Sequence, residues 1–121
     1  MSMSTAKRYG AMDSIRHAGT VAATGSTAAD AARLKRGYQN VTGADGTKGV
    51  KLPPANKTKP GDVVIIKGKT NAVLKVWPGS TGGQINALAD DAAFSMTTGL
   101  MPQMFIADTT TDWVTLPLVA S

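Results

Sequence analysis

Two short apolar segments separated by a polar turn lie in the middle of this chain, and they constrain its fold more than any other feature. A Pro-Gly pair at residues 60–61 precedes the first segment, residues 62–66, in which β-branched residues typical of strands dominate. Residues 67–71 are polar and contain a glycine, and the second segment, residues 72–77, ends at a proline. The order strand, turn, strand predicts a β-hairpin with a longer loop.

Further segments with strand composition occur along the chain. Turn residues separate them at a spacing on the order of ten residues, which is typical of small all-β domains. These segments are residues 38–42, 50–52, 94–97, 104–107 and 113–116. The sequence therefore predicts a mainly β fold, either a small antiparallel sandwich or a barrel.

The first 48 residues follow a different pattern. Residues 1–25 mix cations with small residues and lack sustained periodicity, so we expect an N-terminal arm, with a disordered terminus without a role as the alternative. Residues 27–36 combine the spacing of a capping box with good helix formers, which predicts one short helix, with an extended arm as the alternative. We therefore expect an arm at 1–25, a helix and linker at 26–48, and a β domain at 49–121.

The chain has 121 residues, enough for one domain, but only two each of Trp, Tyr and Phe. Its core must therefore be mainly aliphatic and thin. A thin core in a small β protein favours an oligomer in which neighbouring subunits complete it. The residues expected in the core or in a subunit interface are Ile65, Val76, Trp77, Phe94, Phe105 and Trp113.

Charge is divided unevenly along the sequence, whose formal net charge is +5. Residues 1–69 hold 12 of the 13 Lys and Arg residues but only four of the eight acidic residues, whereas residues 70–121 hold one cation and four acids. The N-terminal part is therefore expected to bind an acidic partner. Nucleic acid is disfavoured, because base stacking needs exposed aromatic residues and only Tyr9 and Tyr38 lie in the basic part.

Residue types used in catalysis and metal binding are scarce. The chain has no Cys and no Glu, and His17 is its single histidine. Asp90 and Asp91 are the one adjacent acid pair, and such neighbours point apart, so we interpret them as part of a solvated link. We expect no enzyme, no metal and no cofactor. No segment has the apolar core of a secretion signal or the roughly 20 apolar residues of a membrane span, so we also expect no membrane contact and synthesis in the cytoplasm.

Five short sequence elements follow one another between residues 49 and 116. They are Gly-Val-Lys-Leu-Pro at 49–53, Pro-Gly-Asp-Val-Val-Ile-Ile at 60–66, Leu-Lys-Val-Trp-Pro at 74–78, Gly-Gly-Gln-Ile-Asn at 82–86, and Trp113. This succession resembles small structural proteins of tailed bacteriophages, in which it marks the compact β domain of capsid decoration or head-fibre proteins. The chain departs from that family in its basic stretch 57–69 and in the pair Pro53-Pro54.

The resemblance implies a virion component on the capsid surface, a homotrimer whose β domain projects and whose N-terminal region binds the major capsid protein. The expected capsid contacts are Lys7, Arg8, Tyr9, Arg16, Arg33, Lys35 and Arg36. The alternative is a small β-barrel module that binds a receptor glycan or nucleic acid. Trp77 and Trp113 are the candidates for stacking on sugars, although each lies at one end of an apolar strand and is expected to be buried.

Overall fold

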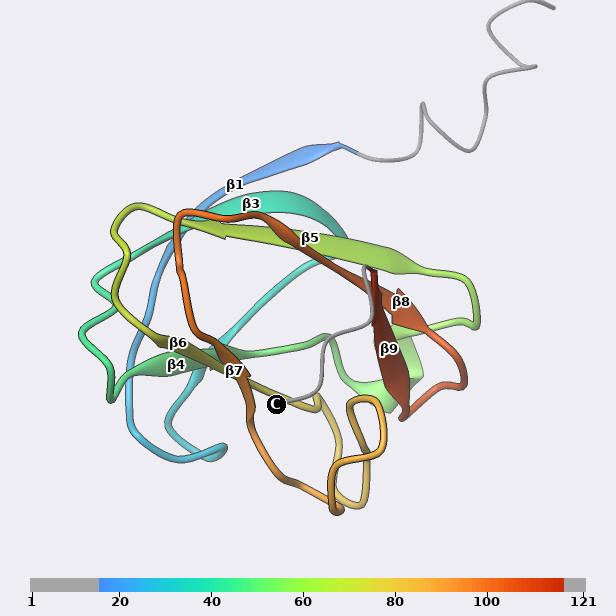
Figure 1. Ribbon diagram of the computed structural model, residues 1–121. Coiled ribbons are helices and arrows are strands. Elements are labelled where there is room, and N and C mark those ends of the chain that lie inside the picture. Colours follow the sequence, from blue (N-terminus) through green and yellow to red (C-terminus); the bar gives the residue numbers. More distant parts are fainter. Residues whose placement is uncertain (1–15, 117–121) are drawn as a thin grey trace, which may run out of the picture.

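The computed structural model describes residues 16–116, which form two β-sheets facing each other (Figure 1). The prediction of a mainly β fold is confirmed, and within the described residues the sheets do not close into a barrel. One turn of 3₁₀ helix, η1, spans Ala55–Lys57. The strands are β1 (His17–Ala22), β2 (Ala32–Arg33), β3 (Gly37–Thr42), β4 (Gly49–Lys51), β5 (Val63–Gly68), β6 (Leu74–Trp77), β7 (Phe94–Met96), β8 (Gln103–Ala107) and β9 (Trp113–Leu116).

Both sheets are mixed. The five-stranded sheet has the order β1-β3-β5-β8-β9, in which the first three strands are parallel and the last two antiparallel to their neighbours. The four-stranded sheet has the order β2-β4-β6-β7, in which only β7 runs antiparallel to its neighbour. The expectation of an antiparallel sandwich is therefore wrong in its strand directions. From β1 to β6 the chain alternates between the two sheets. Consecutive strands of one sheet are therefore separated by one strand of the other, and they pair in parallel: β1 with β3, β2 with β4, β3 with β5 and β4 with β6.

The predicted central hairpin is wrong for the same reason. β5 and β6 lie in different sheets, and residues 69–73 carry the chain from one sheet to the other. Val64 and Ile66 of β5 and Leu74 and Val76 of β6 are all buried without measurable exposure, on the two inner faces. Because the inward and outward alternation is the same in a hairpin and in such an arch, the apolar pattern identifies the strands but not their pairing.

The core lies between the inner faces of the two sheets. Phe94 of β7 and Phe105 of β8 meet there edge to face, with ring centroids 5.4 Å apart and an interplanar angle of 84°. Val76 and Trp113 belong to the same buried cluster, as predicted. Four strands, β6 to β9, therefore contribute these residues to one core.

Ile65 and Trp77, expected in the core or in a subunit interface, both lie outside the main core cluster. Ile65 is only half-buried, because the alternation of β5 points Val64 and Ile66 inward and Ile65 outward. Trp77 is buried, but it lies outside the core cluster, at the register position of β6 opposite Lys51 of β4. Its ring lies close to Gly49 of β4.

The N-terminal third also differs from expectation. Residues 17–22, expected to be part of an arm, form β1 and pair with β3; residues 1–15 of the expected arm lie outside the described part.

The predicted helix is absent from residues 27–36, where a turn is followed by β2. The turn is closed by the N–H groups of Asp30 and Ala31 donating to the carbonyl oxygen of Thr27. β2 belongs to the four-stranded sheet and β3 to the five-stranded sheet, so the boundary expected at residue 49 does not separate these two strands from the β domain.

Candidate functional site

A cationic segment, residues 33–36, connects β2 to β3 and therefore crosses from one sheet to the other. Leu34 is buried, and its backbone N–H donates to the carbonyl oxygen of Lys51 at 2.8 Å. In an extended chain the neighbours of a buried residue point the opposite way. Arg33 and Lys35 are accordingly exposed, and Arg36 after them is exposed as well. One buried leucine thus holds a group of cations at the surface.

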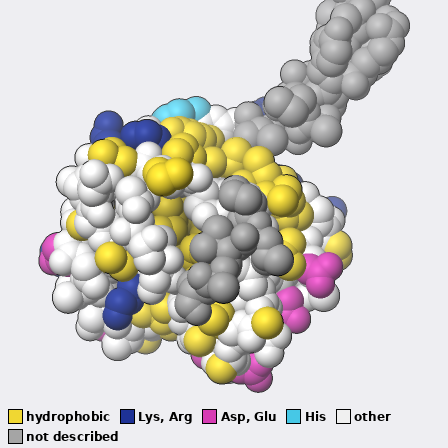
Figure 2. Space-filling model, in the orientation of Figure 1, with side chains coloured by type: hydrophobic (Ala, Val, Ile, Leu, Met, Phe, Trp, Pro, Cys, Tyr) yellow, Lys and Arg dark blue, Asp and Glu magenta, His cyan; other side chains and the backbone are white. Residues whose placement is uncertain are grey.

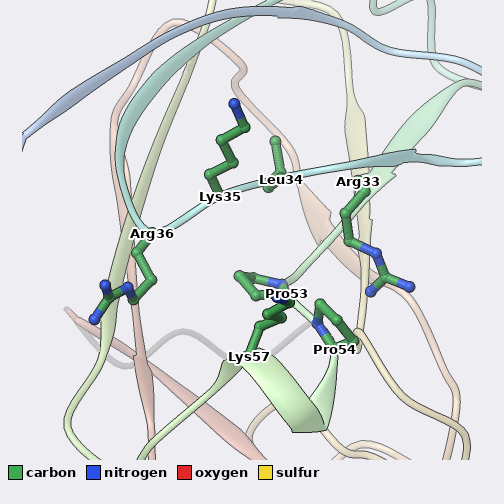
Figure 3. Close-up of a pocket in the computed structure, with 7 residues that line it drawn as sticks. All are labelled: Arg33, Leu34, Lys35, Arg36, Pro53, Pro54 and Lys57. Atoms are coloured by element: carbon green, nitrogen blue, oxygen red, sulfur yellow. The ribbon is translucent and has the colours of Figure 1, made fainter.

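The cationic segment borders an open pocket of about 420 Å³. Figure 3 shows Arg33 and Arg36 on opposite sides of two prolines and the side chain of Lys35 pointing away from them. The wall therefore combines positive charge with an apolar part. The lining residues are Arg33, Leu34, Lys35, Arg36, Pro53, Pro54 and Lys57.

Arg33 is the most firmly held cation of the pocket. Its Nη1 donates to the carbonyl oxygen of Leu52 at 2.6 Å and to that of Gly79 at 2.7 Å, just beyond the ends of β4 and β6. Burial lowers the pKa of Arg33 through desolvation. A guanidinium nevertheless remains protonated at neutral pH, and it carries five N–H donors in a rigid fork. Arg33 therefore supplies a positive charge of fixed position.

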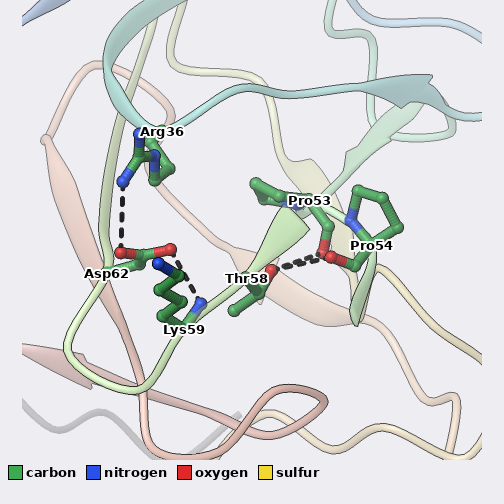
Figure 4. A network of polar contacts seen from close by, with 6 residues as sticks. All are labelled: Arg36, Pro53, Pro54, Thr58, Lys59 and Asp62. Atoms are coloured by element: carbon green, nitrogen blue, oxygen red, sulfur yellow. Dashed lines mark hydrogen bonds and ion pairs between the residues drawn. The ribbon is translucent and has the colours of Figure 1, made fainter. Parts of the chain in front are cut away.

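Arg36 is held more loosely, on the other side of the pocket. Its Nη1 lies 3.4 Å from Oδ1 of Asp62, and the arginine side chain is 65% exposed whereas the aspartate side chain is 13% exposed. Oδ2 of Asp62 accepts a hydrogen bond from the backbone N–H of Lys59 at 2.9 Å (Figure 4). The arginine side of this pair lies mostly in solvent, which makes the pair weak, and Asp62 keeps its hydrogen bond to Lys59 when Arg36 turns toward a ligand.

The turn that carries Lys57 is fixed by Thr58. This buried residue donates its hydroxyl to the carbonyl oxygens of Pro53 at 3.3 Å and Pro54 at 2.9 Å (Figure 4). The backbone N–H of Lys57 donates to the carbonyl of Pro54 at 2.9 Å, and that of Ala55 donates to the hydroxyl of Ser80 at 2.7 Å. The backbone beneath Lys57 is therefore anchored although its side chain is exposed.

Gln39 supports the cationic segment from inside the sandwich. It has no measurable exposure; its Oε1 accepts from the backbone N–H of Lys35 at 2.7 Å, and its Nε2 donates to the carbonyl oxygen of Gly37 at 3.2 Å. We did not predict a role for this residue. The sequence did contain a signal: Gln39 lies between Tyr38 and Asn40 in a predicted strand, and a polar side chain that points into the core needs hydrogen-bond partners there.

The remaining predicted capsid contacts fall into two groups. Lys7, Arg8 and Tyr9 lie outside the described residues. Arg16 is exposed, and its carbonyl oxygen accepts from the backbone N–H of Tyr38 at 2.7 Å, immediately after Arg36 and Gly37 in the sequence. The described chain therefore begins beside the cationic segment. Arg33, Lys35 and Arg36 are together at the pocket, and Lys57 is an additional cation that our set of contacts did not include.

Acidic residues elsewhere are used within loops. Asp91 Oδ1 accepts from the N–H of Gly82 at 2.7 Å, and Asp90 Oδ1 accepts from Nε2 of Gln84 at 2.8 Å. Among residues 16–116 no group of three His, Cys, Asp or Glu side chains is placed to hold a metal ion. That part of the chain also contains no helix long and apolar enough to span a membrane.

The chain matches no known family model, no curated protein and no solved structure. Its own geometry therefore has to indicate what the pocket binds. A fixed guanidinium, two further exposed cations and an apolar wall together suit a carboxylate carried on a short aliphatic stem. Aspartate and glutamate side chains of another protein have this chemistry.

Proposed function

We propose that this protein is a structural component of a bacteriophage virion, a capsid decoration or head-fibre subunit that binds the major capsid protein through its N-terminal region and the cationic pocket. The sequence elements between residues 49 and 116 support the phage assignment. The observation that carries the mode of binding is the gathering of Arg33, Arg36 and Lys57 around one pocket. These cations come from two separate segments, so their proximity depends on the fold.

The position of the N-terminal segment supports the same mode of binding. The described chain starts at Arg16, whose carbonyl is hydrogen-bonded to Tyr38 beside the cationic segment. Lys7 and Arg8 precede this point in the sequence, and we propose that they bind the same acidic surface as the pocket. In a homotrimer three such binding regions act together, so contacts that are weak alone give lasting attachment through effective concentration.

The test is co-sedimentation of the purified chain with capsids assembled without it, counting the bound copies. We expect saturable binding that weakens as salt is raised, because exposed charges are screened. Lys57→Glu should lower the affinity about tenfold or more by placing a like charge opposite the acidic shell. Lys69→Glu is the matched control, because it makes the same change of charge at an exposed lysine. Lys69 directly follows β5, whereas Asp62, the partner of Arg36, directly precedes that strand.

A second variant tests the N-terminal segment. Deletion of residues 1–20 is unsuitable, because it removes most of β1, so the deletion has to end at residue 15. The shortened chain should fold and lose affinity for capsids. Full retention of binding by both the Lys57→Glu protein and the shortened chain would overturn the proposed mode of attachment.

The alternative function is a small β module that binds glycan or nucleic acid. A glycan platform is disfavoured because Trp77 and Trp113 are 7% and 1% exposed, so neither offers a ring face for stacking on sugars. The cationic pocket is compatible with phosphate, and titration with a DNA oligomer at physiological salt distinguishes the two functions. Micromolar affinity for DNA together with no capsid binding would favour the module.

A further inference from the structure

The outer face of the five-stranded sheet is apolar over part of β5, β8 and β9. Burial alternates along β5, β8 and β9, so every second residue points away from the core. Two of these outward residues, Val114 and Leu116, are 37% and 52% exposed. The outward residues that form this face are Val63, Ile65, Met104, Ile106, Val114 and Leu116. We call these six residues the apolar face.

The register of the strands arranges the apolar face in two continuous rows. Ile65, Met104 and Leu116 lie opposite one another in one row, and Tyr38 of β3 extends that row beyond Ile65. The other row consists of Val63, Ile106 and Val114. Figure 2 shows hydrophobic side chains running across the upper part of the molecule, below the single histidine. An apolar surface that is contiguous over three strands is typical of an interaction site.

The free edge of β9 is not the open part of this sheet. The backbone N–H of Trp113 donates to the carbonyl oxygen of Gln84 at 2.8 Å, and the N–H of Asn86 donates back to Trp113 at the same distance. The side-chain oxygen of Asn86 accepts from the N–H of Thr115 at 3.0 Å. Residues 84–86 therefore cover the edge, and a partner has to pack on the face rather than add a strand.

We propose that the apolar face packs against other copies of this chain. The protein carries a formal net charge of +5, so two copies repel each other wherever their lysines and arginines meet. None of the six residues of the apolar face is charged, and the next outward residue of β5, Lys67, marks its end. Copies can therefore come into contact through this face without bringing like charges together.

Charge also separates this face from the capsid contact. An acidic partner is attracted to the cationic pocket, whereas the apolar face offers it no opposite charge and would desolvate its carboxylates. An apolar surface is the matching partner, and another copy supplies one of the same composition. This inference rests on the self-association within the proposed function, but it does not depend on binding to a capsid.

The test is the mass of the full chain in solution, measured by sedimentation equilibrium over a range of concentrations. We expect the unsubstituted protein to have a multiple of the 12.5 kDa of one chain. Leu116→Lys and Val114→Lys should each raise the dissociation constant of the oligomer about tenfold or more, because an unpaired charge buried in an apolar interface is costly. Both side chains lie outside the core, so circular dichroism should show an unchanged fold.

Ala29→Lys is the matched control, because it adds the same charge at an exposed residue of the turn before β2 and should leave the mass unchanged. A monomeric unsubstituted protein would overturn the inference and would leave the face to residues 1–15, residues 117–121 or a different protein. Full association of the Leu116→Lys and Val114→Lys proteins would overturn it as well. Copies that associate through this face but do not bind capsids would instead overturn the proposed function alone.

Discussion

The completely buried side chain of Gln39 accepts, at its Oε1, a hydrogen bond from the backbone N–H of Lys35 at 2.7 Å. The contact joins the inward face of β3 to the surface segment that carries Arg33, Lys35 and Arg36. It also satisfies a backbone donor in a segment that has no strand partner at that point. The position of the cations thus depends on a polar residue inside the sandwich.

Replacing Gln39 with leucine should therefore affect both stability and binding. The substitution keeps a similar volume but leaves the N–H of Lys35 without its partner, which costs about 1–3 kcal/mol in the free energy of unfolding. Urea denaturation measures this loss. Lys35→Ala is the control, since it removes the charge and keeps the N–H, and it should change the free energy by less than about 0.5 kcal/mol. Equal stability of the Gln39→Leu protein and the unsubstituted protein would show that the hydrogen bond does not hold the segment.

The strands were largely predictable because their signals are local. Residues 113–116 were predicted and form β9 without change, and the predicted segment 38–42 differs from β3 by one residue. Pairing was not predictable, because it depends on which sheet a strand joins. The β-branched residues of β5 and β6 suit a hairpin and an arch equally well, and the choice is made by burial between two sheets that are built from the whole chain.

The candidate site shows the same limit. Arg33, Lys35 and Arg36 were identified from their charge, but the helix predicted for them has been overridden by tertiary contacts. Leu34 enters the core and bonds to Lys51, which requires an extended chain. The contribution of Lys57 from η1 depends on the packing of Pro53 and Pro54, for which the sequence contains no local signal.

Two neighbouring isoleucines of β5 provide a test of which residues of this strand point into the core. Ile66 is completely buried, whereas Ile65 points outward and is half-buried. Ile66→Ala should lower the free energy of unfolding by about 2–5 kcal/mol, because it leaves a cavity in the core. Ile65→Ala makes the same chemical change on the outer face and should cost about 1 kcal/mol. Denaturation at low protein concentration keeps self-association out of the comparison. A larger loss of unfolding free energy for Ile65→Ala than for Ile66→Ala would contradict the inward orientation of Ile66 and the outward orientation of Ile65.

Asp45 should titrate below the ordinary range of an aspartate. The hydroxyl of Thr47 donates to Oδ1 of Asp45 at 2.7 Å, and the backbone N–H groups of Thr47 and Lys48 donate to the same oxygen. The Thr47 hydroxyl is the main cause that lowers the pKa of Asp45, followed by these backbone donors. Thr47→Val should therefore raise this pKa toward the ordinary value of about 3.9, as measured by carbon NMR of the carboxyl group.

The same hydrogen bonds determine how stability depends on pH. A lowered pKa means that folding favours the ionised carboxyl group. The contribution of Asp45 is therefore fully present above the ordinary pKa of an aspartate and is lost as the pH falls through its lowered pKa. Thr47→Ser keeps a hydroxyl and should leave the titration in place. A pKa that is the same in the Thr47→Val and Thr47→Ser proteins would show that the hydroxyl is not responsible.

Gly49 of β4 should tolerate no side chain, because its neighbours leave no space for one. A Cβ atom at this position would meet the carbonyl oxygen of Lys75 and the ring of Trp77, and both belong to the adjacent strand β6. Gly49→Ala therefore has to push β4 away from β6 or displace the indole ring, which should cost about 1–3 kcal/mol in the free energy of unfolding. Tryptophan fluorescence during urea denaturation reports both the loss of stability and a change around Trp77. Ser95→Ala is the control, since Ser95 pairs with Lys75 from the opposite side and the change removes only a hydroxyl. If Gly49→Ala were as stable as Ser95→Ala, the close packing of Trp77 on β4 would have to be abandoned.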